Sequence, residues 1–301
     1  MRLPYLRHGT IIGACPYWDN ILDETNTNFF SDLESLSEVH QLFRKIQIMD
    51  RVFLLQDRAG CCANLVIGDS RALLFDTCCG WDDLMGAVRE LTGLPLLVIN
   101  SHGHYDHVGG NAQFDRVYLH AADFPLLSLH EPELLRRWRR EMAPGSENDT
   151  PVVPAGVWGN TLPLDFQEFD LGGFSGELIP LPGHTEGSVG VWFPSMRLLL
   201  SGDALTPVMC LNFAGHLSPA EQKATLLRVI ELKPDIYLTS HQDHAFDGSL
   251  LPLMLQCVRD TQTKKGYAYE YPVPPYGSVR LFLNSKGSEP VALICEAQSA
   301  P

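Results

Sequence analysis

Short apolar runs, each closed by a polar or turn-forming residue, constrain the fold of this 301-residue chain more than any other feature. Such runs are too short for amphipathic helices and are typical of buried β-strands. Helical patterns follow the strands in each half of the chain, so we predict a duplicated α/β plan. The first three runs, VFLLQ, NLVIG and ALLFD, are predicted to be successive antiparallel strands. The runs are VFLLQ, NLVIG, ALLFD and LPLLVI in the first half, and GELIPL, VGVWF, RLLLSG and DIYLT in the second.

Helical spacing of apolar residues marks several segments between these runs. Ser218 is a favourable N-cap residue, and Pro219 suits the first helical position that follows it. The tail adds one more helix, an aromatic and proline-rich loop (YAYEYPVPPYGS), and a hairpin from VRLFL to VALICE. A segment rich in Pro, Gly and polar residues, 143–160, is predicted to be a loop and a candidate lid. The predicted helices cover residues 31–46, 81–91, 121–142 and 218–232.

The segment Ser101–Gly110, SHGHYDHVGG, concentrates ligand-type side chains directly after a buried strand. His102 and His104 point the same way in extended backbone, while Asp106 and His107 can face a second point nearby. The two glycines behind them let the following helix begin close to the site. Imidazole and carboxylate are ligands of borderline cations such as Zn²⁺. One ion does not need four such side chains from a single loop. The spacing therefore predicts two metal positions.

Further ligand-type residues stand at the ends of later strand-like runs. His184 lies in LPGHTEGS, Asp203 in LLLSGDAL and His241 in LTSH. Converging loops at strand ends commonly form functional sites, so these residues are expected to meet the first group. His244, in SHQDH, is an alternative to His241 as the last ligand. Of the two, His241 directly follows a strand-like run.

The ordered segments DTCCG, SHGHYDHVGG, LPGHTEGS, SGDAL and LTSH resemble the motifs of the metallo-β-lactamase superfamily. The resemblance covers about residues 46–245. It implies an α/β fold, a four-layer αββα sandwich with two β-sheets between helices. We accordingly expect an N-terminal extension over residues 1–45 and a catalytic domain over residues 46–301 that ends in the C-terminal hairpin.

The resemblance also implies a role for each motif residue. Asp76, in LLFDT, matches an aspartate that supports the metal site from behind. The implied ligands are His102, His104 and His184 for the first metal and Asp106, His107 and His241 for the second, with Asp203 bridging the two.

Differences within the family point to one branch. The commonest zinc β-lactamases have a cysteine where this chain has Asp203, so the chain is more similar to glyoxalase II and acyl-homoserine lactonases. We predict a dinuclear hydrolase that activates a bridging hydroxide to cleave a small ester, lactone or thioester. Asp106 is the candidate catalytic residue that would take or pass on a proton. The tail does not clearly match the glutathione-binding region of glyoxalase II.

The cofactor is predicted to be two divalent metal ions, foremost zinc, with iron or manganese as alternatives. Two other activities stay open from the sequence. One is an iron-dependent oxidoreductase on the same fold, and the other is a phosphodiesterase that acts on small phosphoesters.

The formal net charge of −14 disfavours binding to an extended polyanion such as nucleic acid. We see neither a membrane-spanning stretch nor a signal peptide, so the prediction is a cytoplasmic protein with a small-molecule substrate. The first 45 residues could cover the active site or support a homodimer. Eight cysteines are expected to be reduced, and the pairs Cys61-Cys62 and Cys78-Cys79 are interpreted as small hydrophobic residues.

Overall fold

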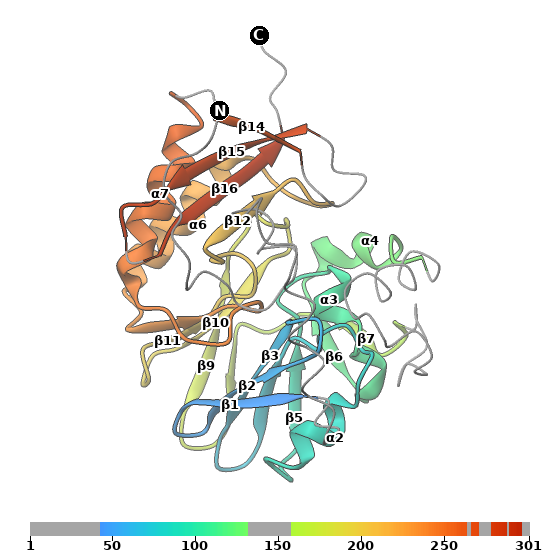
Figure 1. The fold of residues 1–301 in the computed structure, drawn as a ribbon. Helices are drawn as coiled ribbons and strands as arrows, with labels where there is room; N and C mark the ends of the chain where they lie inside the picture. Colours follow the sequence, from blue (N-terminus) through green and yellow to red (C-terminus); the bar gives the residue numbers. More distant parts are fainter. Residues whose placement is uncertain (1–42, 132–157, 264–265, 271–277, 288, 297–301) are drawn as a thin grey trace, which may run out of the picture.

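The computed structural model describes residues 43–131, 158–263, 266–270, 278–287 and 289–296. Within these residues the strands form three sheets of seven, five and four strands (Figure 1). No helix in these ranges is long and apolar enough to cross a membrane.

The first sheet follows chain order from β1 to β7. The pairs β2–β3 and β3–β4 are antiparallel, as predicted. β1, which was not predicted, pairs antiparallel with β2, and the pairs from β4 to β7 are parallel. The two short strands β6 and β7 complete the sheet on the far side of β5, the strand that precedes the histidine-rich segment. The strands are β1 (Arg44–Met49), β2 (Val52–Gln56), β3 (Cys62–Ile67), β4 (Ala72–Phe75), β5 (Leu96–Ile99), β6 (Val117–Leu119) and β7 (Thr161–Pro163).

The start of β1 corrects the prediction of a helix over residues 31–46. Arg44 and Lys45 pair with Gln56 and Leu55 of β2, so the helical pattern does not continue into these positions. Residues 31–42 lie outside the described ranges. The domain boundary at residue 45 stays a prediction.

The second sheet has the order β13-β11-β10-β9-β8. Its neighbours are antiparallel except for β11 and β13, which run parallel. This parallel pair brings the ends of two strands, and the loops that follow them, to the same edge of the sheet. The strands are β8 (Glu168–Asp170), β9 (Ser175–Pro180), β10 (Val189–Phe193), β11 (Leu198–Leu200) and β13 (Ile236–Leu238).

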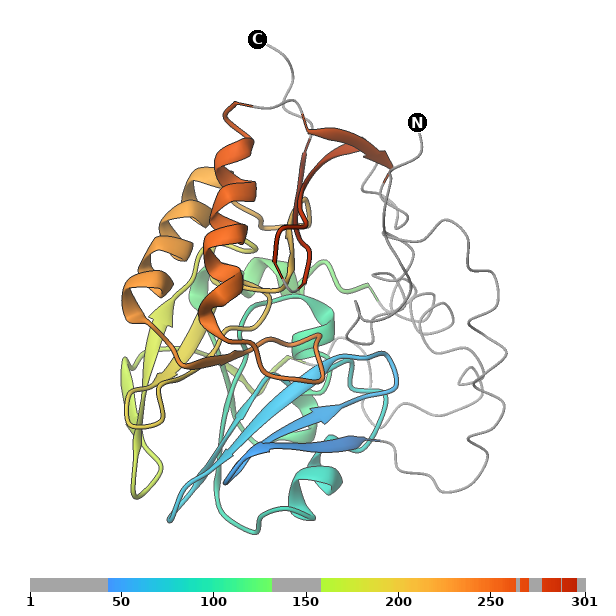
Figure 2. The ribbon, with the colours of Figure 1, turned by 60° about the vertical axis from the view of Figure 1, so that its left-hand side comes forward.

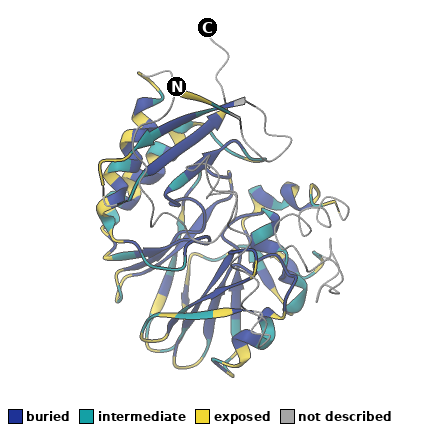
Figure 3. Cartoon of the chain, viewed as in Figure 1, coloured by how far each residue is buried: buried dark blue, intermediate teal, exposed yellow. Residues whose placement is uncertain are grey.

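Three apolar clusters define the layers of the sandwich. Leu54 and Phe75 of the first sheet pack with Phe193 of the second, so the two sheets share one buried core (Figure 3). On the outer face of the first sheet, Leu84 of α2 packs against strand residues. On the outer face of the second sheet, Leu226 of α6 (Pro219–Leu232) packs against strand residues, together with residues of α7 (Leu251–Asp260). The predicted four-layer αββα sandwich is confirmed.

Two helices are shorter than the sequence pattern indicated. The helix predicted over residues 81–91 is α2, which covers Leu84–Arg89. The predicted helix over residues 121–142 is a 3-10 turn and then α4, which ends at Leu127, and residues 132–142 lie outside the described ranges. The helices are α2 (Leu84–Arg89), α3 (Tyr105–Val108), α4 (Phe124–Leu127), α6 (Pro219–Leu232) and α7 (Leu251–Asp260), with 3-10 helices η2 (Asn111–Gln113), η3 (Ala121–Asp123) and η4 (Gly248–Leu250). Ser218 caps α6 as predicted, since its side chain accepts a hydrogen bond from the Ala220 N–H.

A third sheet, with the order β12-β16-β15-β14, was not predicted. The C-terminal hairpin is confirmed as β15 and β16, but it pairs with β12 on one side and β14 on the other. Figure 2 shows α6 and α7 side by side next to this sheet. The strands are β12 (Val208–Leu211), β14 (Tyr267–Glu270), β15 (Ser278–Asn284) and β16 (Val291–Glu296).

The core between the two sheets should dominate the stability of the fold. Leu54 is fully buried, so Leu54→Ala should lower the free energy of unfolding by about 2–5 kcal/mol through lost contacts and a residual cavity. Leu227, on α6 and 39% exposed, is the matched control, and its replacement by alanine should change stability by less than about 0.5 kcal/mol. Urea unfolding of both variants checks the prediction, and equal losses would contradict it.

Candidate metal centre

The predicted ligands come from loops and helix starts that follow strands of both sheets. The carboxyl end of each strand is fixed by its pairing, so the residues that follow it are aimed from a rigid base. The structure brings all seven predicted ligands to one region. They are His102 and His104 after β5, Asp106 and His107 in α3, His184 between β9 and β10, Asp203 after β11, and His241 after β13.

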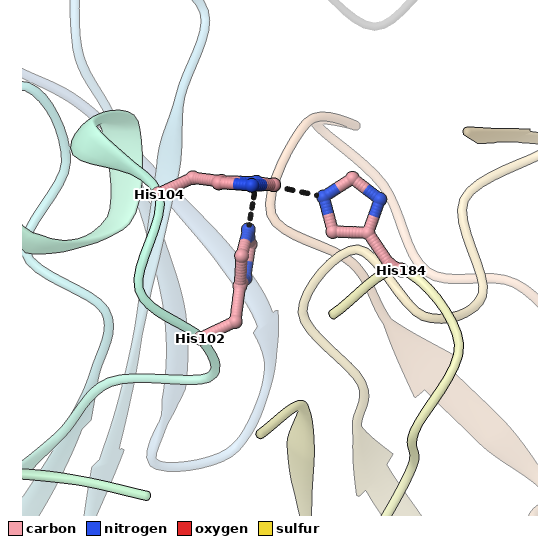
Figure 4. A group of neighbouring side chains, drawn as sticks. All are labelled: His102, His104 and His184. Atoms are coloured by element: carbon pink, nitrogen blue, oxygen red, sulfur yellow. Dashed lines mark hydrogen bonds between the residues drawn. The ribbon is translucent and has the colours of Figure 1, made fainter. Parts of the chain in front are cut away.

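Three imidazole rings converge at the first position. His102 Nε2 lies 3.0 Å from His104 Nδ1, and that atom lies 3.0 Å from His184 Nε2. Figure 4 shows the rings pointing toward one another, two from one loop and one from another. The ring planes are nearly perpendicular, at 85° to 89°. Nitrogen atoms rather than ring faces therefore meet at this point.

The outward nitrogens of two of these rings fix their tautomers. His104 Nε2–H donates to the Ala214 carbonyl at 2.8 Å, and His184 Nδ1–H donates to the Cys210 carbonyl at 2.9 Å. The inward nitrogens then carry lone pairs, and burial lowers the pKa of both His104 and His184 to about 4. Neutral nitrogens facing each other at this distance suit a shared cation, so these residues fit a divalent metal such as zinc.

A second group of side chains adjoins the first. Asp106 Oδ2 lies 3.4 Å from His241 Nε2 and 3.6 Å from His107 Nε2. Asp203 Oδ2 lies 3.1 Å from His241 Nε2, 3.6 Å from His107 Nε2 and 3.7 Å from His184 Nε2. Asp203 therefore stands between the two groups and faces nitrogen atoms of both.

Buried atoms without partners also fit a cation in the second group. His107 Nε2 and Asp203 Oδ1 are buried and form no hydrogen bond within the described part of the chain. Burial alone would lower the pKa of His107, but the carboxylates of Asp106 and Asp203 outweigh it and raise that pKa well above its usual value. Burial would raise the pKa of Asp203, but His241 and His107 hold it well below the usual range. Asp203 is thus ionised at neutral pH and can act as an anionic ligand.

Asp76 lies directly behind the second group and is itself 1% exposed. Its Oδ2 accepts hydrogen bonds from His107 Nδ1 at 2.9 Å and from the hydroxyls of Ser101 and Ser240. Its Oδ1 accepts from the Ser101 N–H at 2.6 Å. Because Asp76 accepts the hydrogen of His107 Nδ1, Nε2 is the nitrogen that faces Asp106 and Asp203 and that would bind a cation in place of its proton.

Asp123 is a positioning residue that the sequence analysis missed. Its carboxylate accepts hydrogen bonds from the Gly103 N–H and the Thr185 hydroxyl through Oδ2, and from the Gly187 N–H through Oδ1. It therefore ties the loop of His104 to the loop of His184. The signal was absent because Asp123 lies in a helix-like run, where an acidic residue is ordinarily solvent-exposed.

The two glycines that end SHGHYDHVGG were predicted to let a following helix begin close to the site, and the structure gives them a different role. The helix lies within the motif, as α3, and only the short η2 follows it. A Cβ atom at Gly109 would lie 2.5 Å from the Cys79 carbonyl oxygen, and one at Gly110 would lie 2.3 Å from that of Thr77. The glycines let the segment that follows β4 pass directly behind the candidate metal ligands.

The last histidine of the SHQDH segment has separate contacts. His244 is partly exposed and lies 3.2 Å from Asp243 and 3.7 Å from Glu289, whereas His241 is 3% exposed and contacts Asp203. The geometry favours His241 over His244 as the ligand.

Most of the apolar segment after Asp203 lies in the core rather than beside the candidate centre. Met209 and Leu211 are buried in the core of β12, at about 1% exposure. Only Phe213 reaches the centre, with ring centroids 5.9 Å and 6.0 Å from those of His104 and His184. Phe213 lies beyond Leu211, the last residue of β12, so its side chain is not held in the strand with those of Met209 and Leu211.

Comparison with known proteins agrees with this geometry. Residues 59–241 match the family model of the metallo-β-lactamase superfamily, and this span is more than half of the chain. The chain belongs to the metallo-β-lactamase superfamily. A solved member, a metallo-β-lactamase from Pontibacter korlensis, shares its fold with a TM-score of 0.51 at 19% identity, over 72% of this chain and 99% of that one.

Curated relatives within the metallo-β-lactamase superfamily include hydrolases. Acyl-coenzyme A thioesterase MBLAC2 of Bos taurus is 27% identical over 211 residues, which cover 61% of this chain and 74% of that protein. Hydroxyacylglutathione hydrolase of Methylococcus capsulatus is 31% identical over 141 residues, which cover 46% of each. These relatives support a hydrolase.

Proposed function

We propose that this chain is a dinuclear, zinc-dependent hydrolase that cleaves the thioester or ester bond of a small acyl compound. The position of Asp203 carries the proposal. Its Oδ2 lies 3.7 Å from His184 Nε2 and 3.6 Å from His107 Nε2, so a single carboxylate oxygen faces both ligand groups. A carboxylate shared by two clusters of nitrogen ligands is the arrangement of a two-metal site.

The ligand residues divide the work of such a site. Two divalent ions, when bound, lower the pKa of water and polarise a carbonyl oxygen. His102, His104 and His184 would hold one ion, while His107 and His241 would help to hold the other. The side chain of Asp106 is 22% exposed and that of Asp203 is 10% exposed, so Asp106 is the acidic group more accessible to a substrate. We assign to Asp106 the proton transfer to the leaving group.

The names of the relatives support the thioester as the first substrate class to test. Acyl-coenzyme A and hydroxyacylglutathione are both thioesters, and the relatives named for hydrolysing them match 61% and 46% of this chain. A thioester also has a good leaving group, so hydrolysis does not require strong acid catalysis. Esters and lactones are attacked at the same kind of carbonyl.

Metal analysis beside a substrate panel tests the proposal. Protein purified without added metal should contain two zinc ions per chain by plasma mass spectrometry. It should hydrolyse acyl-coenzyme A or acyl-glutathione thioesters faster than phosphodiesters, lose this activity with a chelator, and recover it with zinc. One iron per chain with oxygen consumption would instead favour an oxidoreductase, and turnover of phosphodiesters alone would favour a phosphodiesterase. Either outcome overturns the proposal.

A further inference from the structure

The loop between β2 and β3 brings a thiol to the candidate metal centre. Cys61 Sγ lies 4.0 Å from Asp106 Oδ2, and a nitrogen of His241 joins them in a group whose ligand atoms all lie within 4.8 Å of one another. Cys61 is 1% exposed and His241 is 3% exposed. His241 Nδ1 is buried and forms no hydrogen bond within the part of the chain that the structure describes. A thiol, a carboxylate and an imidazole therefore meet at the second ligand group.

The backbone, rather than the thiol, fixes this loop in place. Buried Asp57 accepts hydrogen bonds from the N–H groups of Ala59 and Cys61, both at 2.9 Å, and from the Cys79 N–H at 3.3 Å. Gly60 has a φ of 83°, a conformation that favours glycine and turns the chain just before Cys61. The position of Sγ near Asp106 is thus determined by a hydrogen-bonded turn that would persist if the thiol were removed.

The neighbouring cysteine, Cys62, packs in the core and serves as a comparison for Cys61. Cys62 Sγ lies 3.6 Å from the Gln242 carbonyl and 3.6 Å from Gln56 Nε2, and the residue packs in the core between the two sheets. Successive residues at the start of β3 point to opposite faces, so Cys61 turns the other way. The interpretation of both as small hydrophobic residues suits Cys62 but omits the contact of Cys61 with Asp106.

We propose that Cys61 is a thiolate ligand of the second metal position, together with Asp106 and His241. This inference rests on the dinuclear centre of the proposed function. Zinc bonds of about 2.3 Å to sulfur and about 2.0 Å to oxygen or nitrogen place adjacent ligand atoms of one ion roughly 3.0–3.7 Å apart. The observed 4.0 Å between Sγ and Asp106 Oδ2 is close to this separation, and a small side-chain rotation closes the difference.

A thiolate ligand would give the two positions different metal preferences. The first position offers three imidazole nitrogens, which suit zinc, copper, iron and nickel alike. A sulfur ligand at the second metal position would favour the binding of zinc or cobalt over that of the harder ions manganese and magnesium. A coordinated thiol is deprotonated outright, so loading of the second position should release the proton of Cys61.

Cobalt substitution tests the assignment directly. Metal-free protein titrated with Co²⁺ should develop a thiolate-to-cobalt charge-transfer band in the near ultraviolet when the second equivalent binds. Cys61→Ser and Cys61→Ala should lose the band and bind the second cobalt at least about tenfold more weakly, since one coordinating atom is gone. Cys62→Ser and Cys79→Ser are the matched controls and should keep the band. Cys79 is the sharper control, because its Sγ lies 3.8 Å from that of Cys61.

The outcomes separate this inference from the proposed function. Wild-type protein that binds two cobalt ions and hydrolyses substrate without the band overturns the ligand assignment and leaves the function in place. Retention of the band in Cys61→Ser, or its loss only in Cys79→Ser, overturns it as well. Protein that binds no cobalt overturns both. If the Cys61 variants do not fold, zinc-edge X-ray absorption of the wild-type protein decides, because a sulfur shell at about 2.3 Å is then expected.

Discussion

Asp203→Ala should abolish hydrolysis, with kcat/KM falling at least about a thousandfold, because removal of the carboxylate between the two ligand groups removes the charge that holds two cations together. His107 and His241 would keep their buried nitrogens but lose an anionic neighbour at 3.6 Å and 3.1 Å. We expect the metal content to fall from two ions toward one per chain. Plasma mass spectrometry and thioester hydrolysis, measured on the same preparation, check both parts.

Two further variants make this result specific. Asp203→Asn keeps the shape of the side chain and removes its charge, so it should lose most of the activity while circular dichroism stays that of the wild type. Asp115→Ala removes an exposed aspartate between the first and second ligand motifs and should leave kcat/KM within about twofold. Full activity in Asp203→Ala would mean that the Asp203 carboxylate is not needed, and it would contradict the hypothesis of a two-metal site.

Asp76→Ala should be among the most destabilising single substitutions in the described part of the chain. It leaves the donors of Ser101, Ser240 and His107 without their shared acceptor in a region that is fully buried. Loss of one partner of a buried ionic network costs about 3–5 kcal/mol. Asp76 also has a φ of 71°, a conformation that alanine adopts less readily than aspartate or asparagine.

Urea unfolding in the presence of a chelator isolates this effect from metal binding. Asparagine tolerates the backbone conformation at position 76 but cannot accept all the hydrogen bonds of the carboxylate. Asp76→Asn should therefore lose less free energy of unfolding than Asp76→Ala. Asp69→Ala removes an exposed aspartate that is paired with Arg51, and it should change stability by less than about 1 kcal/mol. Equal stability of Asp76→Ala and wild type would show that the network does not hold the ligand loop.

The meeting of the candidate ligand residues could be predicted because the segments that hold them follow strands whose apolar runs are visible in the sequence. His184, Asp203 and His241 lie far apart in the chain, yet all three follow runs that end at one edge of a sheet. The pairing of β15 with β16 was equally accessible, since both strands are apolar and a short polar turn joins them. Local pattern was sufficient wherever the partner strand was adjacent in sequence or the motif was dense.

Long-range pairing explains most of what was missed. β12 pairs in parallel with β16, and Met209 lies opposite Leu293, a partner that no local pattern identifies. The segment VMCL was therefore not predicted as a strand. Cys61 was missed for a related reason, because its neighbour Asp106 lies 45 positions away and approaches only when the first sheet has formed.

The hydrogen bond from Ser240 to Asp76 has a consequence for the order in which the chain folds. It joins residues 164 positions apart, and closure of so long a loop carries a large entropic cost before the contact stabilises anything. Local pairs such as β3 with β4 can form early, whereas this bond requires both sheets to have docked. The second ligand group should consequently be one of the last parts of the protein to become ordered during refolding. Metal added early would encounter scattered histidines, so the rate at which bound metal is acquired should report the docking of the two sheets.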